Sequence, residues 1–290
     1  MADFLLGVLL DGFRTDVRTA LGLAAKAGAQ GVQIYSTRGD MAPENLTPQK
    51  RRALLDMVKA HGLAISALCG DLGGGGFTHP EKNAEKIERS KRILDLAKDL
   101  ETDVVTTHIG VVPGDPAHPR YGILQEACGT LAEYADSVEA HFAIETGPET
   151  SAVLKGFLDS LGSRGVAVNL DPANLVMVTG DDPAGAVYAL KDYIVHTHAK
   201  DGRQNYYKDP EVVYGMKKEN LSHIITGPSF EEVPLGEGQV DWAAYLDALR
   251  GIGFRGFLTV EREVGDRPYD DIVHAIEFLK AKIRRFNHTS

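Results

Sequence analysis

The chain has 290 residues, 43% of them hydrophobic, with 41 acidic and 31 basic side chains and a formal charge of −10. The length suits one α/β barrel domain, and the acidic balance disfavours nucleic acid as a partner because it repels phosphate backbones. No stretch reaches the roughly 18 apolar residues that span a membrane, so we expect no membrane partner either.

Neither cysteine has the spacing of a disulfide framework or a metal knuckle: Cys69 and Cys128 lie far apart in apolar segments. The first residues also lack a basic leader and a small-residue cleavage pattern. We therefore expect a cytoplasmic protein in a reducing compartment.

In chain order, short β-rich runs alternate with helix-length amphipathic segments. The predicted strands are 4–10, 31–36, 63–70, 103–110, 141–147, 165–171, 194–201 and 257–263. The predicted helices include 47–62, 80–100, 123–140, 241–253 and 269–286. In the first of these, Thr47 is suited to the N-cap, Pro48 to the first helical position and Gly62 to the position just past the end.

Strict alternation of strands and helices requires a parallel sheet, because parallel neighbours need crossover connections. Eight such units in 290 residues predict an α/β protein consisting of a single (β/α)8 TIM barrel over residues 1–290. The segment 201–240, after the seventh strand, is the one long irregular connection. We expect such a loop to be functional or to lie at a subunit contact, and we expect a homo-oligomer.

The glycine-rich segment "GDLGGGGF" at 70–77 could suggest a phosphate-binding loop. It lacks the Lys-Ser/Thr pair of a P-loop and the GxGxxG spacing of a dinucleotide site. We therefore interpret it as a flexible lid or turn.

Ionisable residues stand at the carboxyl ends of several predicted strands, where barrel enzymes carry their working side chains. They are His108, Glu145, Asp171, His198 and Glu261. Three carboxylates at one mouth would repel one another and lose hydration unless a cation compensates them. Glu145, Asp171, His198 and Glu261 would offer three oxygens and one nitrogen to one divalent metal ion, a set that suits Mn²⁺, Co²⁺ or Mg²⁺ better than a closed structural Zn²⁺ site.

Simpler structural roles are available for each of these residues. His196 lies on the same strand face as His198 but one layer deeper, where a hydrogen-bonded core histidine is the favoured interpretation. Asp171 precedes a proline and suits a turn or a helix cap. Glu145 or Glu261 alone would suit an arginine partner, although the adjacent Arg262 faces the other way.

Several segments resemble the xylose isomerase-like barrel superfamily, and the likeness covers essentially the whole chain. They are "THIG", "AIETG", "NLDPANL", "HTHAKDG", "PLGEGQVDW" and "LTVERE". The resemblance to the epimerase branch implies that Glu145, Asp171, His198 and Glu261 bind one metal, with Mn²⁺ preferred and Co²⁺, Mg²⁺ or Zn²⁺ as alternatives. It also implies that Glu145 and Glu261 are the catalytic acid and base.

The implied activity is a sugar or keto-sugar isomerase or epimerase. One glutamate would remove a proton next to a carbonyl, the metal would stabilise the enediolate, and the other glutamate would return the proton on the opposite face. A lyase of the same fold, either a dehydratase or a C-glycoside-cleaving enzyme, remains open. A non-catalytic sugar-binding barrel is the alternative outside enzyme chemistry.

The chain departs from two branches of this superfamily. Endonuclease IV-like hydrolases need further ligands for three zinc ions. This sequence has no histidine between its third strand and His79, carries Asn174 where another histidine would stand, and lacks the Asp-x-His pair of the seventh loop. Ketose 3-epimerases place a substrate-facing histidine at the position of Asn174. The departures make a DNA-repair hydrolase the weakest enzymatic alternative and weigh against a free ketohexose as substrate.

The remaining polar candidates for substrate contacts are His108, Asn174, Lys200 and Arg203. A salt bridge is an equally good expectation for Lys200, and a surface charge on a loop is one for Arg203. The tyrosines of "NYYKDPEVVY" at 205–214 would cover the mouth or pack against another subunit. No basic cluster resembling a phosphate clamp follows strands seven and eight, so we expect a non-phosphorylated small carbohydrate as partner.

Overall fold

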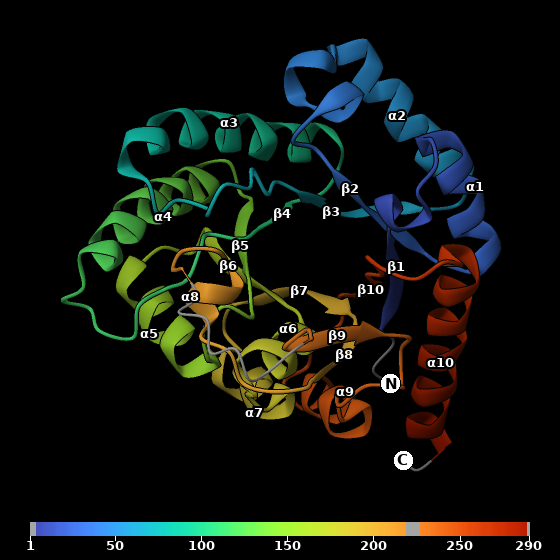
Figure 1. The fold of residues 1–290 in the computed structure, drawn as a ribbon. Helices are drawn as coiled ribbons and strands as arrows, with labels where there is room; N and C mark the ends of the chain where they lie inside the picture. Colours follow the sequence, from blue (N-terminus) through green and yellow to red (C-terminus); the bar gives the residue numbers. More distant parts are fainter. Residues whose placement is uncertain (1–3, 219–226, 289–290) are drawn as a thin grey trace.

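The eight predicted strand segments close into one barrel in the computed structural model, which describes residues 4–218 and 227–288 (Figure 1). The strands are β1 (Leu5–Leu9), β2 (Gly31–Tyr35), β3 (Ala64–Cys69), β4 (Val104–Thr107), β5 (His141–Glu145), β6 (Val166–Leu170), β7 (Ile194–Ala199) and β10 (Phe257–Val260). All neighbours run parallel, and β10 pairs with β1 to complete the circle. The prediction of a (β/α)8 TIM barrel is confirmed.

Helices surround the barrel, and α10 packs beside α1 where the chain closes on itself (Figure 1). They are α1 (Val17–Ala27), α2 (Pro48–Ala60), α3 (Pro80–Asp99), α4 (Pro119–Ser137), α5 (Ser151–Leu161), α6 (Pro172–Asn174), α7 (Pro183–Ala189), α8 (Pro210–Val213), α9 (Trp242–Gly251) and α10 (Pro268–His288). Short turns are η1 (Leu10–Phe13), η2 (Gly39–Met41), η3 (Pro43–Asn45) and the π-helical turn η4 (Leu175–Thr179). Among the described residues, no helix combines the length and apolarity needed to cross a membrane.

The start and end of α2 show how local sequence sets these boundaries. The Thr47 side chain accepts a hydrogen bond from the backbone N–H of Lys50, and Pro48 occupies the first helical position. Gly62 follows the helix with a φ of 72°, a left-handed conformation that glycine adopts without a steric penalty. The predicted capping of this helix is confirmed.

The connection 201–240 is more ordered than the sequence suggested. It contains a two-stranded antiparallel sheet of β8 (Asp201–Gln204) and β9 (Phe230–Val233), with α8 between them. The buried Asp201 carboxylate organises the base of this segment, because it accepts hydrogen bonds from the backbone N–H groups of Gly236 and Val240 and from the Trp242 indole. Hydrogen bonds to one buried carboxylate hold this segment in place. Its sequence therefore lacks the apolar periodicity from which strands are normally predicted. Residues 219–226 of the predicted loop lie outside the described residues.

The barrel interior is layered. Small apolar side chains fill one layer, from Ala67, Val104, Ala143 and Ala167. A second layer is polar, and its buried members hydrogen-bond across the barrel, as Gln33 does to Thr106 and His196 does to Asn169 and Thr259. Ionisable side chains at the carboxyl ends of the strands lie beyond this polar layer. The interior therefore gives those groups a rigid, hydrogen-bonded floor.

Candidate metal centre

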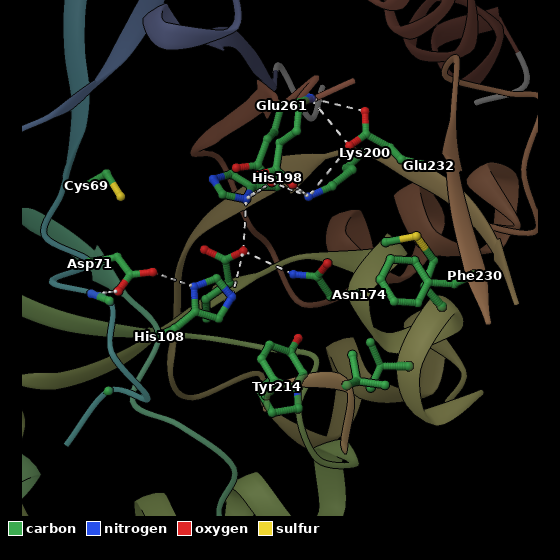
Figure 2. Close-up of a pocket in the computed structure, with 18 of the residues that line it drawn as sticks. Cys69, Asp71, His108, Asn174, His198, Lys200, Tyr214, Phe230, Glu232 and Glu261 are labelled. Carbon is green, nitrogen blue, oxygen red and sulfur yellow. Dashed lines mark hydrogen bonds and ion pairs between the residues drawn. The ribbon is translucent and has the colours of Figure 1, made fainter. Parts of the chain in front are cut away.

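Glu145, Asp171, His198 and Glu261 meet at the carboxyl end of the barrel. Each offers one ligand atom, and the four atoms all lie within 4.8 Å of one another. The Nδ1 atom of His198 is 3.5 Å from Glu145 Oε1, 3.4 Å from Asp171 Oδ2 and 3.3 Å from Glu261 Oε2. The structure thus brings together all four residues that the sequence singled out as metal ligands, of which Figure 2 labels His198 and Glu261.

The strand geometry explains why His198 faces this cluster and His196 does not. Both point into the barrel because side chains two residues apart share a strand face. His196 lies deeper and bonds Asn169 Oδ1 through Nδ1 and Thr259 Oγ1 through Nε2, so it is a hydrogen-bonded core residue as predicted. His198 instead bonds Gln33 Oε1 through Nε2 at 2.9 Å, which turns Nδ1 toward the carboxylates.

Asp171 serves two purposes at once. Its Oδ1 atom accepts a hydrogen bond from the backbone N–H of Asn174 and so caps α6, the structural role that its proline neighbour suggested. Its Oδ2 atom faces His198. The π-helical turn η4 follows α6 directly, and such turns are frequent at functional sites.

The distances from His198 to its three carboxylate partners suit a divalent cation. An ion bound at about 2.1 Å by ligands in tetrahedral directions would hold those ligand atoms roughly 3.4 Å apart. The observed distances from His198 Nδ1 to the three carboxylate oxygens, 3.3–3.5 Å, agree with this value. Three carboxylate oxygens and one imidazole form a donor set that favours hard to borderline ions.

The charges of the cluster call for positive compensation. Burial raises the pKa of Asp171, and the nearby His198 offsets this only in part. Burial has the same effect on Glu261, but Lys200 and His198 outweigh it and lower the pKa of Glu261 well below its usual range. Burial disfavours the charged His198 ring, yet Glu261 and Glu145 raise the pKa of His198 well above its usual range. Positive charge at this point is what keeps the carboxylates ionised.

Lys200 is buried at the edge of the cluster and paired with several acids. Its Nζ atom lies 2.9 Å from Glu261 Oε2, 2.5 Å from Glu263 Oε2 and 4.0 Å from Glu232 Oε2. These carboxylates, and not the neighbouring Asp201, are its partners. Lys200 also lines the cavity. It therefore combines the two expected roles, because it forms salt bridges and also faces the space where a substrate would bind.

His108 and Asn174 both contact Glu145; Figure 2 shows His108 and Asn174 beside the cluster. Asn174 Nδ2 donates to Glu145 Oε1 at 3.1 Å, and His108 Nε2 is 3.5 Å from the same oxygen. Asp71 lies 3.3 Å from His108 Nδ1 and orients the ring. Burial disfavours the charged ring, but Glu145 and Asp71 raise the pKa of His108 to about 9.

Arg203 does not reach the site. Its guanidinium donates to the backbone carbonyl of Glu237 and pairs with Glu231 at 3.6 Å on the exposed side of β8. Alternation along β8 accounts for this position, because the strand points successive side chains to opposite faces. Arg203 is therefore a surface charge, which was the alternative role expected from the sequence.

A cavity of about 660 Å³ opens over the cluster. Of the tyrosines in the connection after β7, Tyr214 lines this cavity and lies 6.4 Å from the His108 ring, centroid to centroid. Tyr206 instead donates to the Gly227 carbonyl, and Tyr207 is 65% exposed. Tyr214 is therefore the tyrosine of 205–214 that lines the cavity.

The sequence prediction missed several residues of the site, although all but Glu232 left a signal in the sequence. Gln33 is the one polar residue in the apolar run "GVQIY", and a period-two strand turns it inward to His198. Asp71 follows the third strand directly, the position at which other site residues were sought. Glu263 lies two residues after Glu261 at the end of the predicted eighth strand, where period-two alternation places both on the same side. Glu232 gave no such signal, because only the tertiary fold brings β9 beside Lys200.

Comparison with curated proteins finds relatives at low identity. An uncharacterized protein of Methanocaldococcus jannaschii is 24% identical over 213 residues, which cover 69% of this chain and 63% of the relative. An inosose dehydratase of Lacticaseibacillus casei is 25% identical over 144 residues, which cover 49% of this chain and 46% of that protein. The matches thus span about half to two thirds of these relatives' length.

Solved structures share the fold over nearly the whole chain. A xylose isomerase domain protein from Planctomyces limnophilus superposes with a TM-score of 0.80 at 24% identity, covering 99% of both chains. A D-tagatose 3-epimerase-like protein superposes with a TM-score of 0.75 at 17% identity, again covering 99% of both. A family model matches residues 21–282, and the chain belongs to the xylose isomerase-like TIM barrel family.

Proposed function

We propose that this protein is a divalent-metal-dependent isomerase or epimerase that acts on a sugar or keto-sugar. The observation that carries the proposal is the convergence of Glu145, Asp171, His198 and Glu261 on one point at the floor of the cavity. The two glutamates come from β5 and from the end of β10, with β6 and β7 between them. They therefore approach a bound substrate from two sides.

Mn²⁺ fits the proposed site best, and Co²⁺, Mg²⁺ and Zn²⁺ are alternatives. A cation held by these four residues would act as a Lewis acid that acidifies the C–H bond beside a carbonyl and stabilises the resulting enediolate. Gln33 would support this function through its hydrogen bond to His198 Nε2, which leaves Nδ1 free as the ligand.

The two glutamates are suited to move the proton. Burial favours their neutral forms, but His108 and His198 lower the pKa of Glu145, and Lys200 and His198 lower that of Glu261. Both are therefore available as bases. In an epimerisation one would take the proton from the substrate carbon and the other would return it on the opposite face.

Substrate hydroxyls would find their partners on the same floor. Lys200, His108 and Asn174 all line the cavity within reach of the cluster. Tyr214 adds a hydroxyl that accepts or donates no hydrogen bond among the described residues, and its ring lies beside His108. The acidic chain and the absence of a second metal-binding group among the described residues favour a small carbohydrate over nucleic acid.

A lyase reaction is the second candidate, favoured by the similarity to an inosose dehydratase. Elimination begins with the same proton abstraction and then needs an acid for the leaving group. His108 is placed for that task, since it faces the cavity and Asp71 holds its other nitrogen. Product analysis separates the two reactions.

Solvent deuterium incorporation tests the proposal. Purified protein with Mn²⁺ is incubated in D₂O with a panel of ketoses and keto-glycosides, and Glu145→Gln and Glu261→Gln are assayed beside wild type. We expect exchange by wild type and a loss of at least about 10²-fold in each variant, the scale of general acid–base catalysis. Glu237→Gln, which changes an exposed glutamate that does not line the cavity, is the control and keeps full exchange. Full exchange in Glu145→Gln and Glu261→Gln contradicts the mechanism.

A further inference from the structure

The cavity over the cluster has two chemically different halves. Hydrogen-bonding side chains gather at one end, where His108, Asn174, His198, Lys200 and Glu261 lie. In Figure 2 Phe230 lies on the opposite side of the view from Cys69, Asp71 and His108, with Asn174 between them. Apolar side chains from segments packed together continue this second half: Met177, Val178, Val213 and Phe230.

Three separate segments build the apolar half. Met177 and Val178 come from the turn η4, which packs against both α8 and β9. Gly202 on β8 makes room for this arrangement, because a Cβ atom there would lie 2.3 Å from Met177 Sδ. Phe230 begins β9 and is only partly buried, so its ring still faces the cavity. The apolar wall is thus a packed feature of the fold, contiguous with the catalytic floor.

The cavity is too large for one monosaccharide. A hexose displaces about six waters, on the order of 180 Å³ at about 30 Å³ per water, against a cavity of about 660 Å³. A second sugar ring in the remaining space would bury hydroxyl groups against side chains that cannot hydrogen-bond them, which is unfavourable. An apolar group there would instead gain from leaving water.

The rim adds a charge criterion. Glu231 and Glu263 line the cavity with about half of each side chain exposed, 47% and 57% respectively. Together with the net charge of −10 they oppose an anionic substituent.

We propose that the substrate is a glycoside whose sugar ring sits at the metal cluster and whose neutral aromatic or alkyl substituent fills the apolar half of the cavity. The inference rests on the proposed function, since it assumes that the cluster binds the sugar. It adds the substrate class, a sugar joined to an apolar group.

Calorimetric titration tests the inference independently of turnover. Methyl, phenyl and 4-carboxyphenyl glycosides of D-glucose, D-galactose and D-xylose, with their keto forms, are titrated into wild-type protein containing Mn²⁺, and the binding affinity is measured. For at least one sugar, we expect the phenyl glycoside to bind at least tenfold more tightly than the methyl and the carboxyphenyl glycosides. Adding Phe230→Ala or Val213→Ser lowers the phenyl preference toward one, whereas adding Tyr207→Ala, an exposed aromatic in the same connection, leaves it unchanged.

Any other binding result overturns the inference. The deuterium-exchange assay, run in parallel, shows whether the proposed function is also wrong. Equal affinity for methyl and phenyl glycosides, or a phenyl preference that survives Phe230→Ala and Val213→Ser, removes the apolar subsite. If no glycoside binds while wild type exchanges deuterium into free ketoses, the substrate class is wrong and the proposed function stands. If no sugar of either kind binds or exchanges, the proposed function itself fails.

Discussion

Lys200 joins the four-residue cluster to the acidic rim of the cavity, because its buried ammonium lies among Glu232, Glu261 and Glu263. Removing the charge in Lys200→Met leaves buried carboxylates without their partner. We expect a loss of about 3–5 kcal/mol in the free energy of unfolding, measured by chemical denaturation. Lys59→Met, which breaks an exposed pair with Glu101, is the matched control with a much smaller effect. Equal losses in both variants would contradict the buried role of Lys200.

Glu149 is a buried carboxyl outside the cluster. Its Oε2 atom accepts a hydrogen bond from the backbone N–H of Val112, and Oε1 has no partner among the described residues. Burial raises its pKa to about 8, from an ordinary value of 4.5. Between these two values the unfolded chain has lost the proton that the folded chain keeps, so this group makes the fold less stable as pH rises from about 4.5 to about 8.

Glu149→Gln removes that pH dependence, because the amide stays neutral and its oxygen can still accept from Val112. Relative to wild type, we expect the variant to be nearly unchanged at pH 5 and more stable at pH 9 by roughly 2–4 kcal/mol. Denaturation curves at the two pH values check this. A difference between variant and wild type that is the same at both pH values would show that Glu149 does not titrate in this range.

Among the elements, the glycine-rich turn after β3 determines where Asp71 and His108 stand. The Gly73 N–H donates to Asp71 Oδ1, and Lys86 Nζ donates to the carbonyls of Gly73 and Gly76. Gly76 has a φ of 62° and packs so closely on the next loop that a Cβ atom would lie 2.0 Å from the carbonyl carbon of Ile109. The segment expected to be a lid or turn forms a turn packed against the chain that carries His108.

Two alanine substitutions separate close packing from backbone strain in this turn. Gly73 has a φ of 64°, and a Cβ atom added there would meet nothing within 4 Å, so Gly73→Ala should cost only the left-handed strain of about 1–2 kcal/mol. Gly76→Ala has the same strain and also overpacks the turn against Ile109, for a further ~1–3 kcal/mol. Chemical denaturation of both variants measures the difference, and equal destabilisation would refute the packing role.

For the whole molecule, strand alternation and the polar residues at strand ends were enough to predict the barrel and the four clustered side chains. Glu145 and Glu261 were identified because barrel strands bring their carboxyl ends to one mouth. Arg203 was misjudged as a substrate contact because its direction depends on the pairing of β8 with β9, which the sequence pattern of that segment hides. Glu232 reaches Lys200 through the same pairing, so no local pattern could have revealed it.

The central claim is that one cation binds between four strands, and a metal titration tests it most directly. Metal-stripped wild type is titrated with Mn²⁺ while bound metal and the melting temperature are followed, beside His198→Ala, Asp171→Asn and the control His274→Ala, whose ring bonds the Leu235 carbonyl away from the cluster. We predict one ion per chain and a raised melting temperature in wild type and His274→Ala, with both effects lost in the other two variants. Equal metal binding in all four proteins, or none in wild type, would contradict the account.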